Sequence, residues 1–187
     1  GQIYLSPMLF DLGVLPAVDV GKSVSRVGGK AQREAYRVVT GDLKLAYAQF
    51  EELETFARFG ARLDEDTRKV IEHGRRIRAC LKQQESAPMS LPEQLAVLLA
   101  LSADLFDTVP IEQMTEAKRA VQAAAGSIPA QVCERFEAAA KLSDADRQAI
   151  VDIARIALAR FLPQPAAHVD AQTKAVRASG ASRRELP

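Results

Sequence analysis

Three consecutive residues, Gly21-Lys22-Ser23, match the end of a phosphate-binding P-loop, whose backbone amides and lysine would cradle a nucleoside triphosphate. The full pattern also requires a glycine five residues before the Gly-Lys pair, and Pro16 occupies that position. Without that glycine-rich turn the backbone cannot wrap around a phosphate. The sequence therefore predicts no P-loop here.

Imidazoles, thiols and carboxylates are the other groups that could carry chemistry. His73 and His168 are the two histidines, and neither has a second ligand at metal-binding spacing, so we expect no metal site. Cys80 and Cys133 lie far apart outside any C-x-x-C motif and are predicted to be free thiols. Asp64, Glu65 and Asp66 stand at a predicted helix start, where negative charges interact favourably with the positive end of the helix dipole. Nothing positions a Ser/His/Asp triad, so the residues alone indicate no self-contained active site.

The first 27 residues differ from the rest of the sequence. Gln2–Leu5 and Ala17–Val20 are short β-prone runs, and Pro7, Gly13 and Pro16 separate them. Two short strands cannot bury a core by themselves. We therefore predict that residues 1–27 are a short β remnant that needs further strands, which this sequence does not carry.

From Gly28 onward the apolar period is helical. We expect a short helix over Lys30–Val39 that stops at Thr40-Gly41, a second that ends near Gly60, and a third from Asp64 to about Lys82. Ser90 and Ser143 are predicted to cap later helices, and Pro110 and Pro129 stand near the starts of two more. Short connections between these amphipathic segments favour a mainly α fold, a bundle of about six to seven helices over residues 28–162.

Composition narrows the class of protein. The chain has 187 residues, with 48% hydrophobic, 26% charged and 5% aromatic, and a net charge of +1. This balance favours packed helices and gives no electrostatic case for binding nucleic acid. Residues 163–187 lose the helical pattern and are predicted to be a mobile tail. Because the sequence opens with Gly1 in place of Met, we expect a processed or truncated product.

Several sequence blocks, in order, closely resemble the α subunit of F-type ATP synthases. They are G-Q-I-Y-L at 1–5, L-F at 9–10, P-A-V-D-V-G at 16–21, S-V-S-R-V-G-G-K-A-Q at 23–32, L-A-Y-A-Q-F-E-E-L-E at 45–54, F-A-R-F-G-A-R-L-D at 56–64, L-K-Q at 81–83 and P-M-S-L-P-E-Q at 88–94. From about 110 to 162 the likeness is in helix size only. The resemblance implies the end of the nucleotide-binding domain followed by the helical C-terminal domain.

In that family the arginine of the S-V-S-R block reaches into the catalytic site of the neighbouring β subunit. The resemblance thus implies that Arg26 is an arginine finger supplied in trans, and that Ser23, Val24 and Ser25 lie at the interface with that subunit. A guanidinium is always charged and binds two phosphate oxygens at once, which suits it to stabilising a transferring phosphoryl group.

The family's α subunit also binds ATP or ADP with Mg²⁺ without hydrolysing it. The matching positions for binding the adenine are Phe10, Pro16 and Gln83. Leu15 stands where the family commonly has Arg, and Glu85 where it commonly has a second Gln. Losing a cation and gaining an anion should weaken nucleotide binding there. Lys22 also replaces a residue that is usually apolar. We expect no nucleotide to bind this chain alone.

The resemblance implies a place in a rotary, ion-transporting ATP synthase. The implied partners are the β subunits and the central γ shaft, around which the helices form a collar, with the loop near 59–63 contacting the shaft. Attachment to the cytoplasmic face of the bacterial plasma membrane would be peripheral, through the complex. The coupling ion, proton or sodium, stays open, and the chain alone is predicted to be inactive in ATP turnover.

The residues also leave open an alternative function of another class. In this alternative, the protein is a stand-alone helical adapter for protein interactions, with no role in ATP turnover. The β-prone segment and the Ser23–Arg26 block count against it, because an adapter has no use for either. Isolated β-prone segments have unpaired edges, so in the free polypeptide we expect them either to be disordered or to pair with a second copy and form a homodimer.

Overall fold

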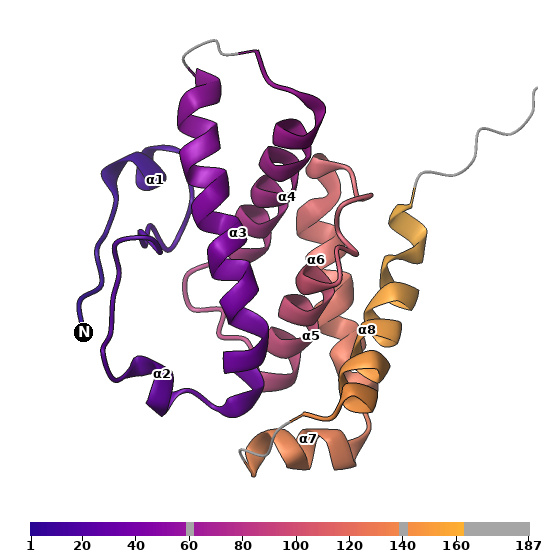
Figure 1. Cartoon of the computed structure of the whole chain (residues 1–187). Coiled ribbons are helices and arrows are strands. Elements are labelled where there is room, and N and C mark those ends of the chain that lie inside the picture. The colour runs from indigo at the N-terminus through magenta and orange to yellow at the C-terminus, as the bar shows by residue number, and fades with distance from the viewer. Residues whose placement is uncertain (59–61, 139–141, 163–187) are drawn as a thin grey trace, which may run out of the picture.

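The computed structural model describes residues 1–58, 62–138 and 142–162. These residues fold mainly into α-helices, shown in Figure 1. The helices are α1 (Pro7–Asp11), α2 (Gly28–Ala31), α3 (Glu34–Arg58), α4 (Glu65–Leu81), α5 (Leu91–Ser102), α6 (Met114–Ala124), α7 (Ala130–Glu137) and α8 (Asp144–Leu158). Three short 3₁₀ turns join or extend them, η1 (Ile111–Gln113), η2 (Ala125–Ser127) and η3 (Ala159–Phe161). The expectation of a mainly helical fold is confirmed.

Helix α3 is longer than the sequence predicts. The expected stop at Thr40-Gly41 is wrong, because α3 continues through both residues to Arg58. A glycine inside a helix costs only about 1 kcal/mol relative to alanine. Ala35, Val39, Leu43, Tyr47 and Phe50 are buried on one face, on both sides of the glycine. Burying these side chains outweighs the local cost.

The predicted helix starts are confirmed at three serine or aspartate caps. The Asp64 carboxylate accepts a hydrogen bond from the Thr67 amide at 2.7 Å and begins α4. Ser90 and Ser143 form capping boxes with Glu93 and Asp146 at the starts of α5 and α8. These local hydrogen bonds satisfy amides that a helix start would otherwise leave unpaired.

Helix α5 lies at the centre of the bundle. It packs against α3 on one side and against α6 and α8 on the other, while α4 pairs with α3 (Figure 1). Leu95, Leu99 and Leu101 of α5 are all at least 95% buried. One continuous core therefore joins residues from α3 to η3.

The contact between α3 and α4 is unusually close at Gly74. Phe50 of α3 is fully buried against this glycine, and a Cβ placed on Gly74 would lie 2.0 Å from the Phe50 Cγ. The Arg78 guanidinium stacks over the Phe50 ring at 4.4 Å and binds the Glu54 carboxylate at 2.9 Å. Gly74 thus allows a helix contact that the neighbouring cation–π and ionic contacts then fix.

Residues 1–27 form a loop around α1 and no regular strand. Gln2 pairs with Val24 and Leu5 with Val18 in isolated antiparallel bridges, so the predicted runs do meet. The prediction of a β remnant is not borne out, because among the described residues these pairings stop at single bridges. Ser23 accounts for part of this, since its hydroxyl takes the Tyr4 amide that a strand would pair with backbone. The predicted tail at 163–187 lies outside the described residues.

Candidate functional site

The segment from Ser23 to Val27 is held in place by its two serines. The Ser23 hydroxyl donates to the Asp19 carbonyl at 2.5 Å and accepts from the Tyr4 amide at 3.1 Å. The Ser25 hydroxyl accepts from the Gly28 amide at 2.9 Å, just before α2. Both hydroxyls are therefore used to shape the backbone around Arg26.

The Arg26 side chain takes no part in these contacts. Arg26 is exposed, and its side chain has no hydrogen bond or ion pair with any other residue that the structure describes. Its neighbours Val24 and Val27 are 58% and 65% exposed. A free guanidinium between two exposed valines has the make-up of a surface that another molecule covers.

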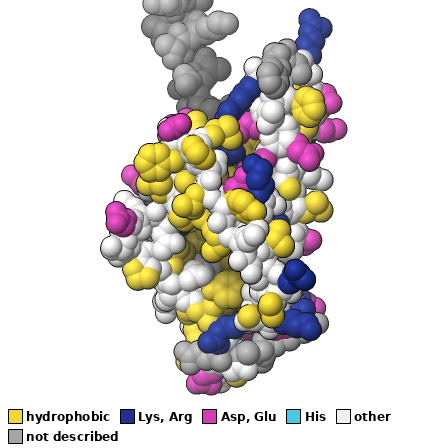
Figure 2. Space-filling view, turned by 90° about the vertical axis from the view of Figure 1, so that its left-hand side faces the viewer, with side chains coloured by type: hydrophobic (Ala, Val, Ile, Leu, Met, Phe, Trp, Pro, Cys, Tyr) yellow, Lys and Arg dark blue, Asp and Glu magenta, His cyan; other side chains and the backbone are white. Residues whose placement is uncertain are grey.

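The whole N-terminal face shares this apolar character. Figure 2 shows hydrophobic side chains gathered on the side of the molecule formed by residues 1–27 and α3. The larger exposed members in this segment are Ile3, Tyr4, Leu5, Met8, Phe10, Leu12, Leu15, Val24 and Val27. A monomer rarely leaves so many large apolar side chains in water.

Lys22 is exposed and forms an ion pair with a neighbouring residue of the same chain. Its ammonium lies 3.0 Å from the Asp19 carboxylate, and its amide donates to the same side chain at 2.9 Å. The hydrogen bond from the Lys22 amide holds the pKa of Asp19 below its usual value. The next helix after Ser23 begins at Gly28, whereas the lysine and serine of a P-loop stand at the start of a helix.

Three of the positions singled out in the sequence meet at a cavity of about 480 Å³ between the N-terminal loop and the α4–α5 connection. Leu15, Gln83 and Glu85 all line it. The Gln83 amide donates to the Leu15 carbonyl at 2.8 Å, and the Gln83 side-chain amide donates to the Ala87 carbonyl at 2.8 Å. These bonds fix the cavity wall, so residues 68 positions apart become neighbours.

The other two predicted nucleotide-binding residues lie differently. Pro16 follows Leu15 directly but is not among the residues lining the cavity, and the peptide between them is cis. Phe10 is on α1, 64% exposed, and also outside the lining. The structure therefore brings Gln83 to the cavity together with Leu15 and Glu85, the two residues that depart from the family pattern. Neither Phe10 nor Pro16 lines it.

Three cations also line the cavity, which sequence reasoning missed. They are Lys82 at the end of α4 and Lys118 and Arg119 on α6. Lys118 is 91% buried, and its ammonium donates to the Lys82 carbonyl at 2.5 Å. Burial lowers the Lys118 pKa, and burial raises the pKa of the nearby Cys80 thiol to about 12. Only the packing of α6 against α4 could reveal these cations.

The lining of the cavity combines apolar, hydrogen-bonding and charged side chains. Leu15, Ala79 and Met89 supply apolar walls, and Gln83 and Glu85 supply hydrogen-bonding groups. Its volume falls within the range of about 300–1,000 Å³ typical of ligand sites. The three cations outnumber Glu85, the one carboxylate in the lining, so the wall attracts anions on balance. The described residues thus offer apolar, hydrogen-bonding and positively charged contacts to a small ligand.

Two predicted features fall at or beyond the limits of the described residues. The proposed shaft loop near 59–63 lies mostly on residues 59–61, outside the described ranges. The histidine at 168 lies outside them as well.

Among the helices that the structure describes, none combines the length and apolarity needed to cross a bilayer.

Comparison with known proteins gives one consistent result. Residues 32–157 match the family model "ATP synthase alpha/beta chain, C terminal domain". The chain is 74% identical over 174 residues to ATP synthase subunit alpha 2 of Albidiferax ferrireducens, covering 93% of this chain and 33% of that protein. It is 70% identical to ATP synthase subunit alpha 2 of Polaromonas naphthalenivorans, over 89% of this chain and 32% of the relative. The chain spans about a third of the length of these relatives.

Proposed function

Because the protein belongs to the family of C-terminal domains of ATP synthase alpha and beta subunits, as the C-terminal portion of an F-type α subunit, we propose that it works within a rotary ATP synthase. In this proposal it is part of the regulatory, non-catalytic subunit, which coordinates ATP synthesis with ion transport. The single observation that carries the proposal is the high identity to named α subunits over nearly all of this sequence.

Arg26 is proposed to complete the catalytic site of an adjacent β subunit. Support comes from its exposure, its lack of partners among the described residues, and the two hydroxyls that shape the segment around it. An arginine held on a shaped backbone loses little freedom when it meets phosphate oxygens. Ser23, Val24 and Ser25 would then form the surrounding contact, with Val24 meeting the partner directly.

The helical bundle is proposed to form a collar around the central γ shaft. Its support is the family membership and a core that is continuous from α3 to η3, which makes the bundle a rigid body. The attachment to the membrane would be peripheral and through the complex alone, at the cytoplasmic face.

The cavity beside Gln83 is proposed to receive the base of the nucleotide that the whole α subunit holds with Mg²⁺. This chain would supply the base-facing wall only, since its sequence carries no P-loop. The family commonly has Arg at the position of Leu15. Lys118 and Arg119 would supply part of the positive charge that is missing there. The chain alone is proposed to be inactive in ATP turnover.

Removing the carboxylate from this cavity should tighten nucleotide binding. In the whole α subunit, Glu85→Gln is expected to lower the Kd for ATP by about tenfold, because an anion beside an anionic ligand is replaced by a neutral hydrogen-bonding group. Fluorescent-nucleotide titration of the purified subunit measures this. Glu52→Gln, which removes an exposed carboxylate from α3 away from the cavity, is the matched control and should leave the Kd unchanged. An equal effect of both variants would argue against the cavity as the site.

Native mass spectrometry of the complex, purified gently from its own cells, tests the proposal as a whole. We expect this sequence within a larger α subunit, in a ring with β subunits. Recovery with unrelated partners, or as a free species, would instead favour the adapter function and remove the role proposed for Arg26.

A further inference from the structure

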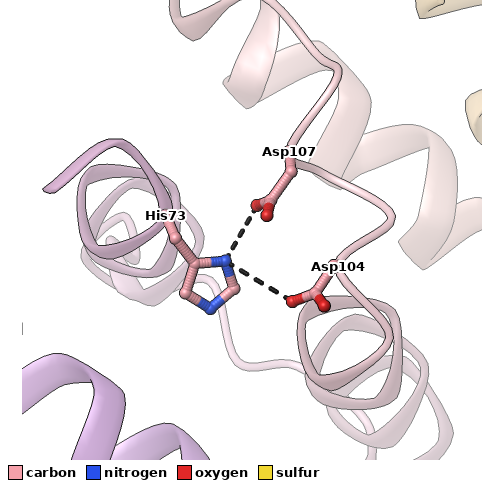
Figure 3. Close-up of side chains that lie close together, drawn as sticks. All are labelled: His73, Asp104 and Asp107. Carbon is pink, nitrogen blue, oxygen red and sulfur yellow. Dashed lines mark hydrogen bonds and ion pairs between the residues drawn. The ribbon is translucent and has the colours of Figure 1, made fainter. Parts of the chain in front are cut away.

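His73 contacts two carboxylates that its own helix does not supply. It lies on α4, and the turn after α5 brings Asp104 and Asp107 to it from 31 and 34 positions further along the sequence (Figure 3). The His73 Nδ1 atom is 2.8 Å from the Asp107 Oδ1 and 3.6 Å from the Asp104 Oδ1. One ligand atom from each of the three residues lies within 4.8 Å of the others.

The spacing is close to what a small divalent cation needs. Two ligand atoms at the usual zinc distances are about 3.4 Å apart in a tetrahedral site. The distance from His73 to Asp104 already meets this value. The distance from His73 to Asp107 needs to open by about 0.6 Å, a side-chain rotation at a residue that is 40% exposed.

The charges in this cluster are not balanced. Among the described residues, Asp104 and Asp107 form ion pairs with His73 and with no other cation. Two carboxylates therefore share one imidazole, and even its protonated form leaves a net negative charge. Arg76 on α4, whose charge acts on His73, donates instead to the Val109 carbonyl at 3.2 and 3.3 Å. It weakens cation binding through space but does not occupy the cluster.

From this arrangement we propose that His73, Asp104 and Asp107 bind a divalent transition metal of the zinc type, which clips α4 to the turn after α5. One imidazole and two carboxylates form a mixed nitrogen and oxygen donor set, which suits Zn²⁺ or Co²⁺ better than Mg²⁺. Three protein ligands leave a fourth position for water. Asp104 is 72% exposed, so the ion can enter from solvent.

The site differs from the proposed nucleotide cavity in both residues and ligand. The residues lining that cavity include neither the imidazole nor the two carboxylates. The proposal also goes beyond the ATP synthase function, because it concerns a cation bound by the helical bundle itself. A failure here would leave the roles proposed for Arg26 and Gln83 intact.

Isothermal titration of the 187-residue protein with Zn²⁺ tests the proposal, at about pH 8 to favour neutral imidazole. A Cys133→Ser background removes the half-buried thiol, while Cys80 is buried. We expect one ion per molecule, a higher Tm with Zn²⁺ but not with equal Mg²⁺, and Co²⁺ absorption bands typical of low coordination number.

Substitutions of the proposed ligands distinguish binding at this site from nonspecific metal binding elsewhere on the protein. His73→Asn and Asp104→Asn are each expected to weaken Zn²⁺ binding at least about tenfold. His168→Asn, which removes the other histidine, is the control and should change nothing. Asp104 is exposed enough that its variant keeps the fold, which circular dichroism without metal verifies. The proposal is wrong if Zn²⁺ fails to bind, or binds equally well to the His73→Asn and Asp104→Asn variants.

Discussion

Replacing Arg26 with alanine in the assembled complex is expected to lower ATP hydrolysis by about 10³-fold or more, the usual effect of removing an arginine finger. The physical reason is that phosphoryl transfer spreads negative charge over the γ-phosphate oxygens, and a bidentate guanidinium stabilises it. The steady-state hydrolysis rate of the complex measures the effect. The Tm of the isolated protein should not change, because the exposed Arg26 side chain has no described partner to lose.

Two further variants make this result specific. Arg26→Lys keeps the charge but loses the bidentate geometry, so we expect it to restore only a small part of the rate. Arg75→Ala removes another exposed arginine, on α4, and should leave hydrolysis unchanged. Native mass spectrometry should show every variant assembled. A fully active, assembled Arg26→Ala complex would eliminate the finger role.

Adding one methyl group at Gly74 is expected to destabilise the protein by about 3 kcal/mol, at the upper end of overpacking effects. The new Cβ would lie 2.0 Å from the Phe50 Cγ and 2.2 Å from its Cβ, so rotation of the ring cannot relieve the clash. Helices α3 and α4 would have to separate, and the stacking of Arg78 on Phe50 would be lost. Urea unfolding followed by circular dichroism measures the change in free energy of unfolding.

A double mutant shows whether this contact is the cause. Phe50→Ala alone is expected to cost about 4 kcal/mol through its cavity. In the double variant, the alanine methyl at 74 occupies part of that cavity. The double variant should therefore lose about 2 kcal/mol less stability than the sum of the losses in the two single variants. Gly41→Ala is the control: a Cβ there meets no described atom within 4 Å, so it should stabilise α3 slightly. Additive effects at 50 and 74 would contradict the close contact.

Local signals carried most of the helix assignment. Asp64, Ser90 and Ser143 could be recognised as caps because a cap and its partner lie within three residues of each other. The stop predicted at Gly41 failed for the opposite reason. Glycine is a local signal, whereas the burial of Val39 and Leu43 that overrides it depends on packing against the rest of the core.

The candidate sites divide in the same way. Arg26 and Gln83 could be singled out only through the resemblance of their flanking blocks, and their roles stay predictions. Lys118 reaches the cavity beside Gln83 from α6, and Asp107 reaches His73 from the turn after α5. No spacing rule links residues that distant, so packing alone brings them together.

The continuity of α3 has a mechanical consequence. With 25 residues it forms a strut about 37 Å long. One end adjoins the segment that carries Arg26, and the other leads into the connection proposed to touch the shaft. Two helices hinged at Gly41 would absorb a push from the shaft by bending. In the proposed complex, an unbroken strut would instead transmit such a push along its length, and rotation of the shaft would then shift the position of Arg26.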